Sequence, residues 1–234
     1  MKPENSTDLS SNRGPTLWGI LFSPTEQFER MVERPRFGWA LAVMMLVGAL
    51  TAAMMGYSVV QEMPLPDEAG MIDSGQIAVT AGIFGFVGGL IGIPVSLLLI
   101  SLLQKLFMML FQGEATYRQL FSLNTHLYLL TLLANLILAV LLFVLGPRTD
   151  PEIYPTGLAA LVPAEGALKG VLNGIELFAL WKLFLTARGL SVLGRLSSGK
   201  AWTIALILFA GGLLFAALGG WLSEVAESLQ LPQG

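Results

Sequence analysis

The chain has 234 residues, of which 54% are hydrophobic and only 12% are charged; soluble domains carry about twice that charged fraction, so the composition predicts a polytopic helical membrane protein. The net charge of −3 argues against nucleic-acid binding, because a nucleic-acid surface needs clustered Lys and Arg. No cysteine occurs, which excludes disulfides, thiolate catalysis, iron–sulfur clusters and cysteine zinc sites.

Residues 1–20 are expected to form a disordered cytoplasmic tail. Residues 1–16, MKPENSTDLSSNRGPT, are polar and lack the apolar core of a signal peptide. Without a cleaved signal, the first transmembrane helix would direct insertion itself, which suits a bacterial inner membrane or an endomembrane; we expect the bacterial inner membrane.

Residues 21–36 are expected to form a short amphipathic cytoplasmic helix that anchors the chain at the membrane interface, with partner docking as the alternative role. Ser23, Pro24 and Glu26 match an S-x-x-E capping box with proline in the first turn. Apolar residues then fall on one face and charged residues on the other. The residues expected to meet the interface or a partner are Phe28, Arg30, Arg34 and Arg36.

Five apolar stretches follow, each long enough to cross about 30 Å of hydrocarbon. They run over residues 37–60, 77–103, 120–145, 167–187 and 201–222. The expected fold class is therefore all-α, a membrane bundle of five transmembrane helices in residues 37–222, followed by a non-cytoplasmic tail over residues 223–234. The mixed segment 106–111 either extends the second span or lies in the interface.

The distribution of charge predicts the orientation of the bundle. The loop after the first span carries Glu62, Asp67, Glu68 and Asp73 without a cation, whereas residues 188–200 carry cations and no acid. Cytoplasmic segments are enriched in Lys and Arg, so we expect the N-terminus to be cytoplasmic and the C-terminus to lie outside. The cations placed inside are Arg30, Arg34, Arg36, Lys105, Arg118, Arg188, Arg195 and Lys200.

Small residues at helical spacing predict close helix contacts in the second and fifth spans. These residues are Gly82, Gly85, Gly89, Gly92, Gly212, Ala216 and Gly220. Pro94 should kink the second span near the middle of the membrane. A discontinuous substrate-binding helix of the transporter type is the alternative interpretation of this glycine-rich span.

Polar residues inside the apolar spans form the candidate functional site, because an ionisable group in lipid is usually paired or functional. The four residues are Glu176, Asn173, Asn135 and His126. Glu176 is either a structural acid hydrogen-bonded to Asn173, Asn135 or His126, the lining of a hydrated cavity for protons, ions or a small solute, or a contact for a partner or lipid headgroup. Lys182 is expected to snorkel to the cytoplasmic interface.

No catalytic, cofactor-binding or metal-ligating set is expected. One histidine and one membrane acid cannot close an intramembrane metalloprotease site. The sequence also has no G-x-S-x-G elbow, no P-loop and no G-x-G-x-x-G motif after a strand. We therefore expect a protein that is not an enzyme and that uses no cofactor.

Three stretches of the sequence resemble the Yip1 domain family. They are LFSPTEQFERMVERPRFGWAL, FQGEATYRQLFSLNTHLYLL and NGIELFALWKLFLTARGLSVLGRLSSGKA. In the first, Phe22, Pro24 and Phe28 precede charged residues and the Pro35–Arg36 pair, as in bacterial members. The resemblance covers nearly the whole chain after residue 17 and implies a five-helix integral membrane domain.

The resemblance also limits the partners that can be expected. Eukaryotic relatives act in endoplasmic reticulum and Golgi trafficking and contact Rab GTPases through cytoplasmic regions. This sequence lacks their long amino-terminal region and the Asp-Leu-Tyr-Gly-Pro type of phrase before the first helix, so Rab contact is not supported. The partners expected instead are the bilayer with its anionic lipids, and a second copy or other membrane proteins.

Two functions follow from these patterns. The first is a membrane scaffold or accessory subunit in membrane organisation or trafficking, whose small-residue helix faces hold other helices. The second is a small transporter or channel that uses the polar site around Glu176.

Overall fold

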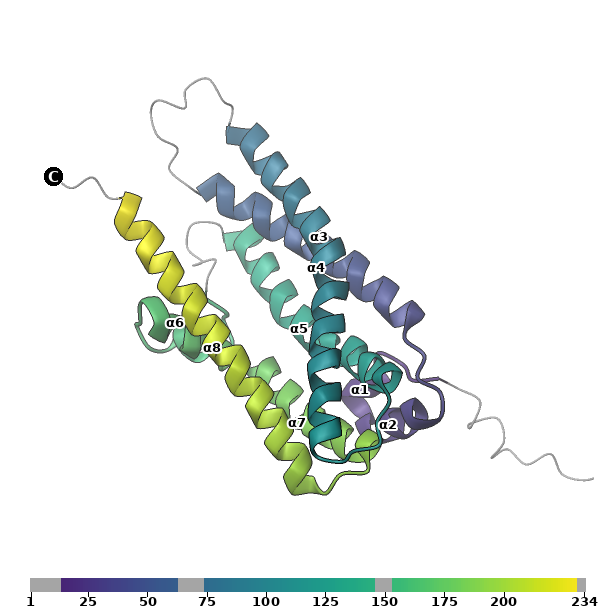
Figure 1. The fold of residues 1–234 in the computed structure, drawn as a ribbon. Coiled ribbons are helices and arrows are strands. Elements are labelled where there is room, and N and C mark those ends of the chain that lie inside the picture. Colours follow the sequence, from purple (N-terminus) through teal and green to yellow (C-terminus); the bar gives the residue numbers. More distant parts are fainter. Residues whose placement is uncertain (1–13, 63–73, 146–152, 231–234) are drawn as a thin grey trace, which may run out of the picture. The chain divides into compact units, whose positions relative to one another are not determined.

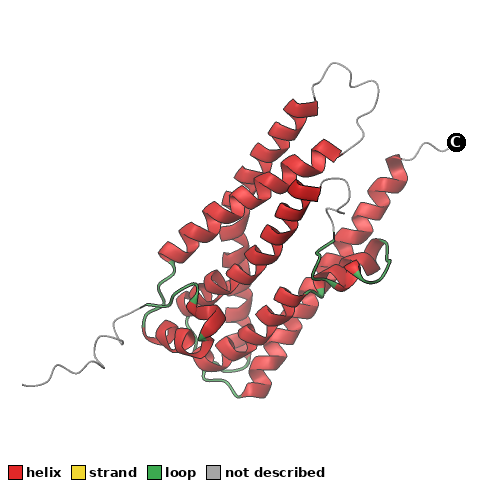
Figure 2. Ribbon diagram, turned by 180° about the vertical axis from the view of Figure 1, so that it is seen from behind, coloured by secondary structure: helices red, strands yellow, loops and turns green. Residues whose placement is uncertain are grey.

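The computed structural model describes residues 14–62, 74–145 and 153–230 (Figure 1). Within them every regular element is a helix (Figure 2). Five helices are long and apolar enough to cross a membrane, which confirms the predicted fold class. These are α3 (Gly38–Glu62), α4 (Ser74–Leu110), α5 (Tyr117–Leu145), α7 (Leu177–Gly194) and α8 (Ser198–Gln230).

Four shorter elements accompany the long helices. They are α1 (Gly19–Phe22), α2 (Pro24–Glu33), α6 (Gly166–Gly174) and the 3₁₀ turn η3 (Leu158–Ala160). Of the tail predicted over residues 1–20, residues 1–13 lie outside the described residues, as does most of the acidic loop after α3. The prediction of disorder is wrong for the remainder of the tail, because α1 starts at Gly19 and Ile20 is 0% exposed.

The fold divides into two compact units, and each of the five long helices contributes a part to each unit. The first unit contains residues up to 44, together with 94–129 and 184–205; the second contains 45–93, 130–183 and 206–234. α5 has the largest buried share of the five helices, 44% of its most apolar window, whereas α4 has 11%. α5 is therefore the central helix for packing, and most of α4 presents its side chains outward.

In the first unit, α2 turns its apolar face into the protein. The amphipathic pattern predicts that Phe28 meets the membrane interface, but Phe28 and Met31 are both 0% exposed. Gln119 of α5 donates a hydrogen bond to the Val32 carbonyl at 2.9 Å, which holds the end of α2. The helix is amphipathic because it covers the protein core, so Phe28 is unavailable to lipid or to a partner.

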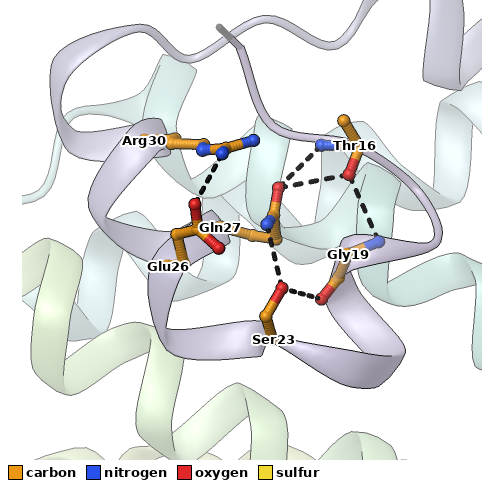
Figure 3. Close-up of polar contacts among 6 residues, drawn as sticks. All are labelled: Thr16, Gly19, Ser23, Glu26, Gln27 and Arg30. Carbon is orange, nitrogen blue, oxygen red and sulfur yellow. Dashed lines mark hydrogen bonds and ion pairs between the residues drawn. The ribbon is translucent and has the colours of Figure 1, made fainter. Parts of the chain in front are cut away.

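The predicted capping box at the start of α2 does not form. Ser23 occupies the N-cap position without a side-chain cap bond, and Glu26 pairs with Arg30 one turn later (Figure 3). Gln27 takes the organising role instead. Its side-chain oxygen accepts the Thr16 backbone N–H at 2.9 Å, and its amide nitrogen donates to the Ser23 hydroxyl at 3.4 Å (Figure 3).

α4 continues to Leu110 and so includes nearly all of the mixed segment 106–111. This segment therefore extends the second span. The chain then reverses at Gln112, which has a left-handed φ of 59°. A buried amide cluster joins the two helices before and after this turn. Asn124 of α5 donates to the Ser101 hydroxyl at 2.9 Å and to the Gln104 side-chain oxygen at 2.8 Å, both on α4.

In the second unit, the glycine face of α4 lies against α3. A Cβ at Gly89 would lie 2.7 Å from the Ala49 Cα, and one at Gly85 would overlap the Ala52 carbonyl. Gly82 lies against the same stretch of α3. Gly92 differs, because a Cβ there would meet no non-local heavy atom within 4 Å among the described residues.

A second close contact joins α6 to α8, which lie side by side in both views (Figures 1 and 2). A Cβ at Gly170 would overlap the Ala216 carbonyl, and one at Gly220 would overlap the Gly166 carbonyl. Gly212 of α8 has open space at its Cβ position within the described part of the chain. Gly220 and Ala216 therefore pack against α6. The sequence predicts α6 only as the first part of one continuous span with α7.

The prediction of one continuous fourth span over residues 167–187 is wrong. The helix is broken between Gly174 and Leu177 into α6 and α7. The predicted loop 188–200 is also mostly helical, because α7 continues to Gly194 and α8 starts at Ser198. At the other end, α8 continues through residues 223–230 of the segment that was predicted as a tail.

Candidate functional site at the break between α6 and α7

The break between α6 and α7 is closed by a short segment of the preceding loop. Leu158 donates its backbone N–H to the Ile175 carbonyl at 3.1 Å, and Leu177 donates to the Thr156 carbonyl at 3.3 Å. Gly157 and Glu176 form the bridge between the two segments. Backbone groups freed by a helix break are costly to bury in lipid without partners, and these bonds supply the partners.

Glu176 caps the helix that starts after the break. Its Oε2 accepts the Phe178 backbone N–H at 2.8 Å and the Thr156 hydroxyl at 3.0 Å. Glu176 is 6% exposed. A carboxylate at a helix N-terminus is stabilised by the unpaired amides and by the helix dipole. The position therefore explains how an acid is tolerated at the edge of an apolar helix.

Tyr154 links the remaining polar residues of the site. Its backbone N–H donates to the Asn173 side-chain oxygen at 2.7 Å, and its hydroxyl donates to the Asn135 side-chain oxygen at 2.6 Å. Burial raises the pKa of Tyr154, and the charge of Glu176 adds to the effect. The phenol therefore remains a proton donor at physiological pH.

Three of the four predicted polar residues meet in this one network, in the second unit. Thr156 donates to Glu176, and Tyr154 donates to Asn173 and to Asn135, so residues 154–156 connect the three. Sequence reasoning missed Tyr154 and Thr156. The signal available was the Tyr-Pro-Thr-Gly turn in an otherwise apolar loop, since a buried tyrosine usually needs a hydrogen-bond partner.

His126 belongs to the first unit. It is 1% exposed, and its Nδ1 lies 2.7 Å from the Ser122 carbonyl one turn earlier in α5. This histidine also lines a cavity formed with residues 14–18 and 36–40. His126 is therefore a hydrogen-bonded core residue that lines a separate cavity.

Lys182 does not snorkel as expected. Its ammonium donates a hydrogen bond to the Thr131 hydroxyl of α5 at 3.0 Å, and it interacts electrostatically with Glu176. Lysine has three donors and no acceptor, so a hydroxyl oxygen on a neighbouring helix is a suitable partner. The interaction with Glu176 extends the polar network along α7.

Two cavities lie beside the break, between α6 and α8. Their volumes are about 630 and 330 Å³, and both are lined by Lys169, Gly220 and Ser223. The larger carries Glu165 and Glu224 as well, and the smaller is lined by Tyr154 and Asn173. The polar network thus borders open space on one side.

The chemistry available at the break is hydrogen bonding. No buried side-chain nitrogen or oxygen lacks a partner in the part of the chain that the structure describes. Within the same residues, no three His, Asp or Glu side chains are grouped so that they could hold a metal ion. The network is a satisfied polar cluster with an acid, a lysine and a phenol.

The charged residues predicted for the interface have separate environments. Arg30 pairs with Glu26 on α2. Arg36 stands exposed between α2 and α3, where it lines the cavity that contains His126. Arg34 is also exposed; Arg36 lines the cavity that contains His126, and the other three predicted interface residues do not.

Comparison with known proteins identifies the family. The model of the Yip1 domain matches residues 18–219. A relative described as membrane protein YknW from Bacillus subtilis (strain 168) is 31% identical over 231 residues, which covers 94% of this chain and 98% of the relative. No solved structure matches. The chain is an integral membrane protein with several membrane-spanning helices, and it belongs to the Yip1 domain family.

Proposed function

We propose that this protein is a non-enzymatic membrane scaffold or accessory subunit that binds other membrane helices in membrane organisation or trafficking. The observation that carries the proposal is the open glycine pair of α4. Gly88 and Gly92 are four residues apart, and a Cβ at either would meet no non-local heavy atom within 4 Å among the described residues.

A glycine face exposed to lipid favours contact with another helix. Glycine in a helix interior is unfavourable by roughly 0.5–1 kcal/mol relative to alanine, and lipid chains gain nothing from its small size. A partner helix does gain, because small residues allow two backbones to approach closely. The remaining glycines of α4, such as Gly85 and Gly89, already make that contact with α3.

The burial of the long helices supports the same function. Only 11% of the apolar window of α4 and 17% of that of α8 is buried. Both helices therefore offer long apolar surfaces to the surrounding membrane, and α8 adds the open Gly211 and Gly212. We infer that the protein forms a homo-oligomer or a complex with other membrane proteins through these helices.

The test is the size of the complex in mild detergent. Light scattering of the purified full chain, together with crosslinking in membranes, should give a defined oligomer or hetero-complex. Gly92→Leu should dissociate it, because the added side chain fills the contact face. Val87→Leu is the matched control, since Val87 is already an exposed apolar side chain. A clean monomer without crosslinked neighbours would refute the proposal.

The broken helix favours a second candidate, a small transporter or channel. Discontinuous helices with polar groups at the break form the substrate sites of many transporters. Here the α6–α7 break carries Glu176 and borders the cavity lined by Tyr154 and Asn173. Reconstituted protein would show flux of protons, ions or a small solute, and Glu176→Gln would reduce it. Flux that is absent, or unchanged in the variant, would exclude this candidate.

The proposed orientation is N-terminus cytoplasmic and C-terminus outside, in a bacterial inner membrane. It rests on the excess of Lys and Arg in the segments assigned to the inside, including Arg195 between α7 and α8. The chain has no native cysteine, so single cysteines at Ser198 and Leu229, near the two ends of α8, can report the sides. An impermeant reagent added outside should label the cysteine at 229 and not that at 198; the reverse would overturn the orientation.

A further inference from the structure

A cavity of about 540 Å³ in the first unit lies where the α3 span begins. Its walls come from residues 14–18, from residues 36–40 and from His126 of α5. Among the described residues that line it there is one cation, Arg36, and no acid. The larger cavity beside α6, by contrast, is lined by Glu165 and Glu224 as well as Lys169.

The backbone and the stem of Arg36 are held in place, while its guanidinium is available. Its carbonyl accepts the Ser122 hydroxyl at 3.2 Å, and its N–H donates to the Arg34 carbonyl at 2.8 Å. The stem lies against Gly14, where a Cβ would come within 2.9 Å of the Arg36 Cδ. The guanidinium itself makes no hydrogen bond or ion pair within the described part of the chain.

A second guanidinium adds positive charge beside the same cavity. Arg118 of α5 lies over the ring of Phe37, 5.9 Å from its centroid, and Phe37 lines the cavity. That ring is itself fixed edge-on against Phe121 at 4.8 Å. Arg36 therefore lines the cavity, and the exposed Arg118 lies over one of its lining rings. The described lining residues include no carboxylate.

The other walls suit the boundary between lipid and water. Trp18 and Trp39 line the cavity and are 66% and 81% exposed, and tryptophan is enriched at the level of the lipid headgroups. The residues of the first turn of α3 also line it. The N–H groups of this first turn have no acceptor within the helix, and they add a weak preference for an anion.

We propose that this cavity binds the phosphate of an anionic phospholipid headgroup, with Arg36 as the principal ligand. Guanidinium matches phosphate in a two-bond geometry, and the acyl chains would lie along the exposed apolar side chains near Trp39. The site depends on the first unit alone and is independent of the function proposed for α4 and α8.

The test measures binding of brominated phosphatidylglycerol to the full chain in nanodiscs of phosphatidylcholine, through quenching of tryptophan fluorescence. Arg36→Gln should weaken the apparent affinity about tenfold, the effect of losing one charge-assisted hydrogen bond. Arg188→Gln is the matched control: it removes an equal charge from an exposed arginine of α7 that does not line the cavity, and it should change the affinity less than twofold.

Further measurements distinguish the lipid headgroup from free phosphate as the ligand, and distinguish lost phosphate contact from misfolding as the cause of weaker binding. Brominated phosphatidylcholine should quench weakly and equally in all variants, and millimolar inorganic phosphate should not displace the lipid. Arg36→Lys should restore part of the binding if charge and phosphate contact are the cause, and unchanged circular dichroism on heating would show that the variants fold. The proposal is overturned if Arg36→Gln and Arg188→Gln weaken binding equally, if no preference for the anionic lipid exists, or if free phosphate competes as well as the lipid.

Discussion

Alanine substitutions at Gly89 and Gly92 should have opposite effects on stability, although the two glycines lie three residues apart in α4. A Cβ at Gly89 would lie 2.7 Å from the Ala49 Cα and 3.3 Å from its Cβ. The Ala49 Cα belongs to the α3 backbone and cannot rotate away, so α3 and α4 must separate. Forcing a methyl group into a packed contact costs about 1–3 kcal/mol.

Gly92→Ala meets no such obstacle within the described residues. Both substitutions gain the same helix propensity, roughly 0.5–1 kcal/mol, so this contribution cancels in the comparison. Gly89→Ala should therefore be less stable than Gly92→Ala by about 1–3 kcal/mol. Gly92→Ala alone should be as stable as the natural protein or slightly more stable.

The assay is unfolding in mixed micelles with increasing SDS, followed by circular dichroism at a protein concentration where the chain is monomeric. The difference in midpoint between the two variants gives the overpacking contribution directly. Equal midpoints would refute the inference that α4 contacts α3 through Gly89. A strong loss in Gly92→Ala under monomeric conditions would show that Gly92 packs inside the monomer and would also weaken the proposed partner face.

Three further predictions concern the buried polar groups. Glu176→Ala should lower the free energy of unfolding by about 1–3 kcal/mol, since it removes a helix cap and leaves the Thr156 hydroxyl without an acceptor. Glu176→Gln should lower the free energy of unfolding less. Unfolding in mixed micelles measures both variants. Tyr154 has a raised pKa in the folded protein, so the unfolded chain loses the phenol proton first as pH rises above 10. The natural protein should therefore lose stability above pH 10, and Tyr154→Phe should remove the part of this loss that Tyr154 causes. Asn124→Leu should destabilise the protein by about 1–3 kcal/mol, because it leaves the Gln104 amide without its partner; a loss no larger than that of an exposed Leu98→Ala control would contradict the role of the cluster.

The number of long helices and their order could be predicted because both depend on composition. An apolar stretch of transmembrane length forms a helix because a helix satisfies all of its backbone hydrogen bonds within the segment. The glycines of α4 at positions 82, 85 and 89 share a face because of helical periodicity. The prediction that Glu176 and Asn173 belong to one polar site follows from the same periodicity, and the structure joins them in one network.

The helix break could not be predicted, because its cause lies elsewhere in the chain. The sequence around Ile175 contains no proline. Asn173 and Gly174 form a dipeptide that is typical of turns, but glycine is also common inside transmembrane helices, so the dipeptide alone does not distinguish a break from a continuous helix. The break is stable because residues 154–158 supply hydrogen bonds to the freed groups, as Leu158 does for the Ile175 carbonyl. A pattern of local periodicity carries no information on such a partner.

The direction in which α2 turns its apolar face could not be predicted for a similar reason. An amphipathic helix beside an apolar span is equally compatible with lipid and with a protein core, and only tertiary packing decides between them. Phe28 and Met31 are fully buried, so the apolar face of α2 packs on the protein core. The polar residue that fixes the helix, Gln27, has no distinctive sequence signature.

The closure of the helix break also bears on the order in which this protein can be assembled. The hydrogen bonds described at the break join residues close in sequence: Thr156 and Glu176 are 20 positions apart, and Tyr154 is 19 from both Asn135 and Asn173. Short loops close at small entropic cost. The end of α5, the loop and the start of α7 can therefore pair before α8 has been synthesised, and α8 then docks onto an α6 that is already in place. An insertion machinery would never have to hold the broken helix in lipid with its backbone unpaired.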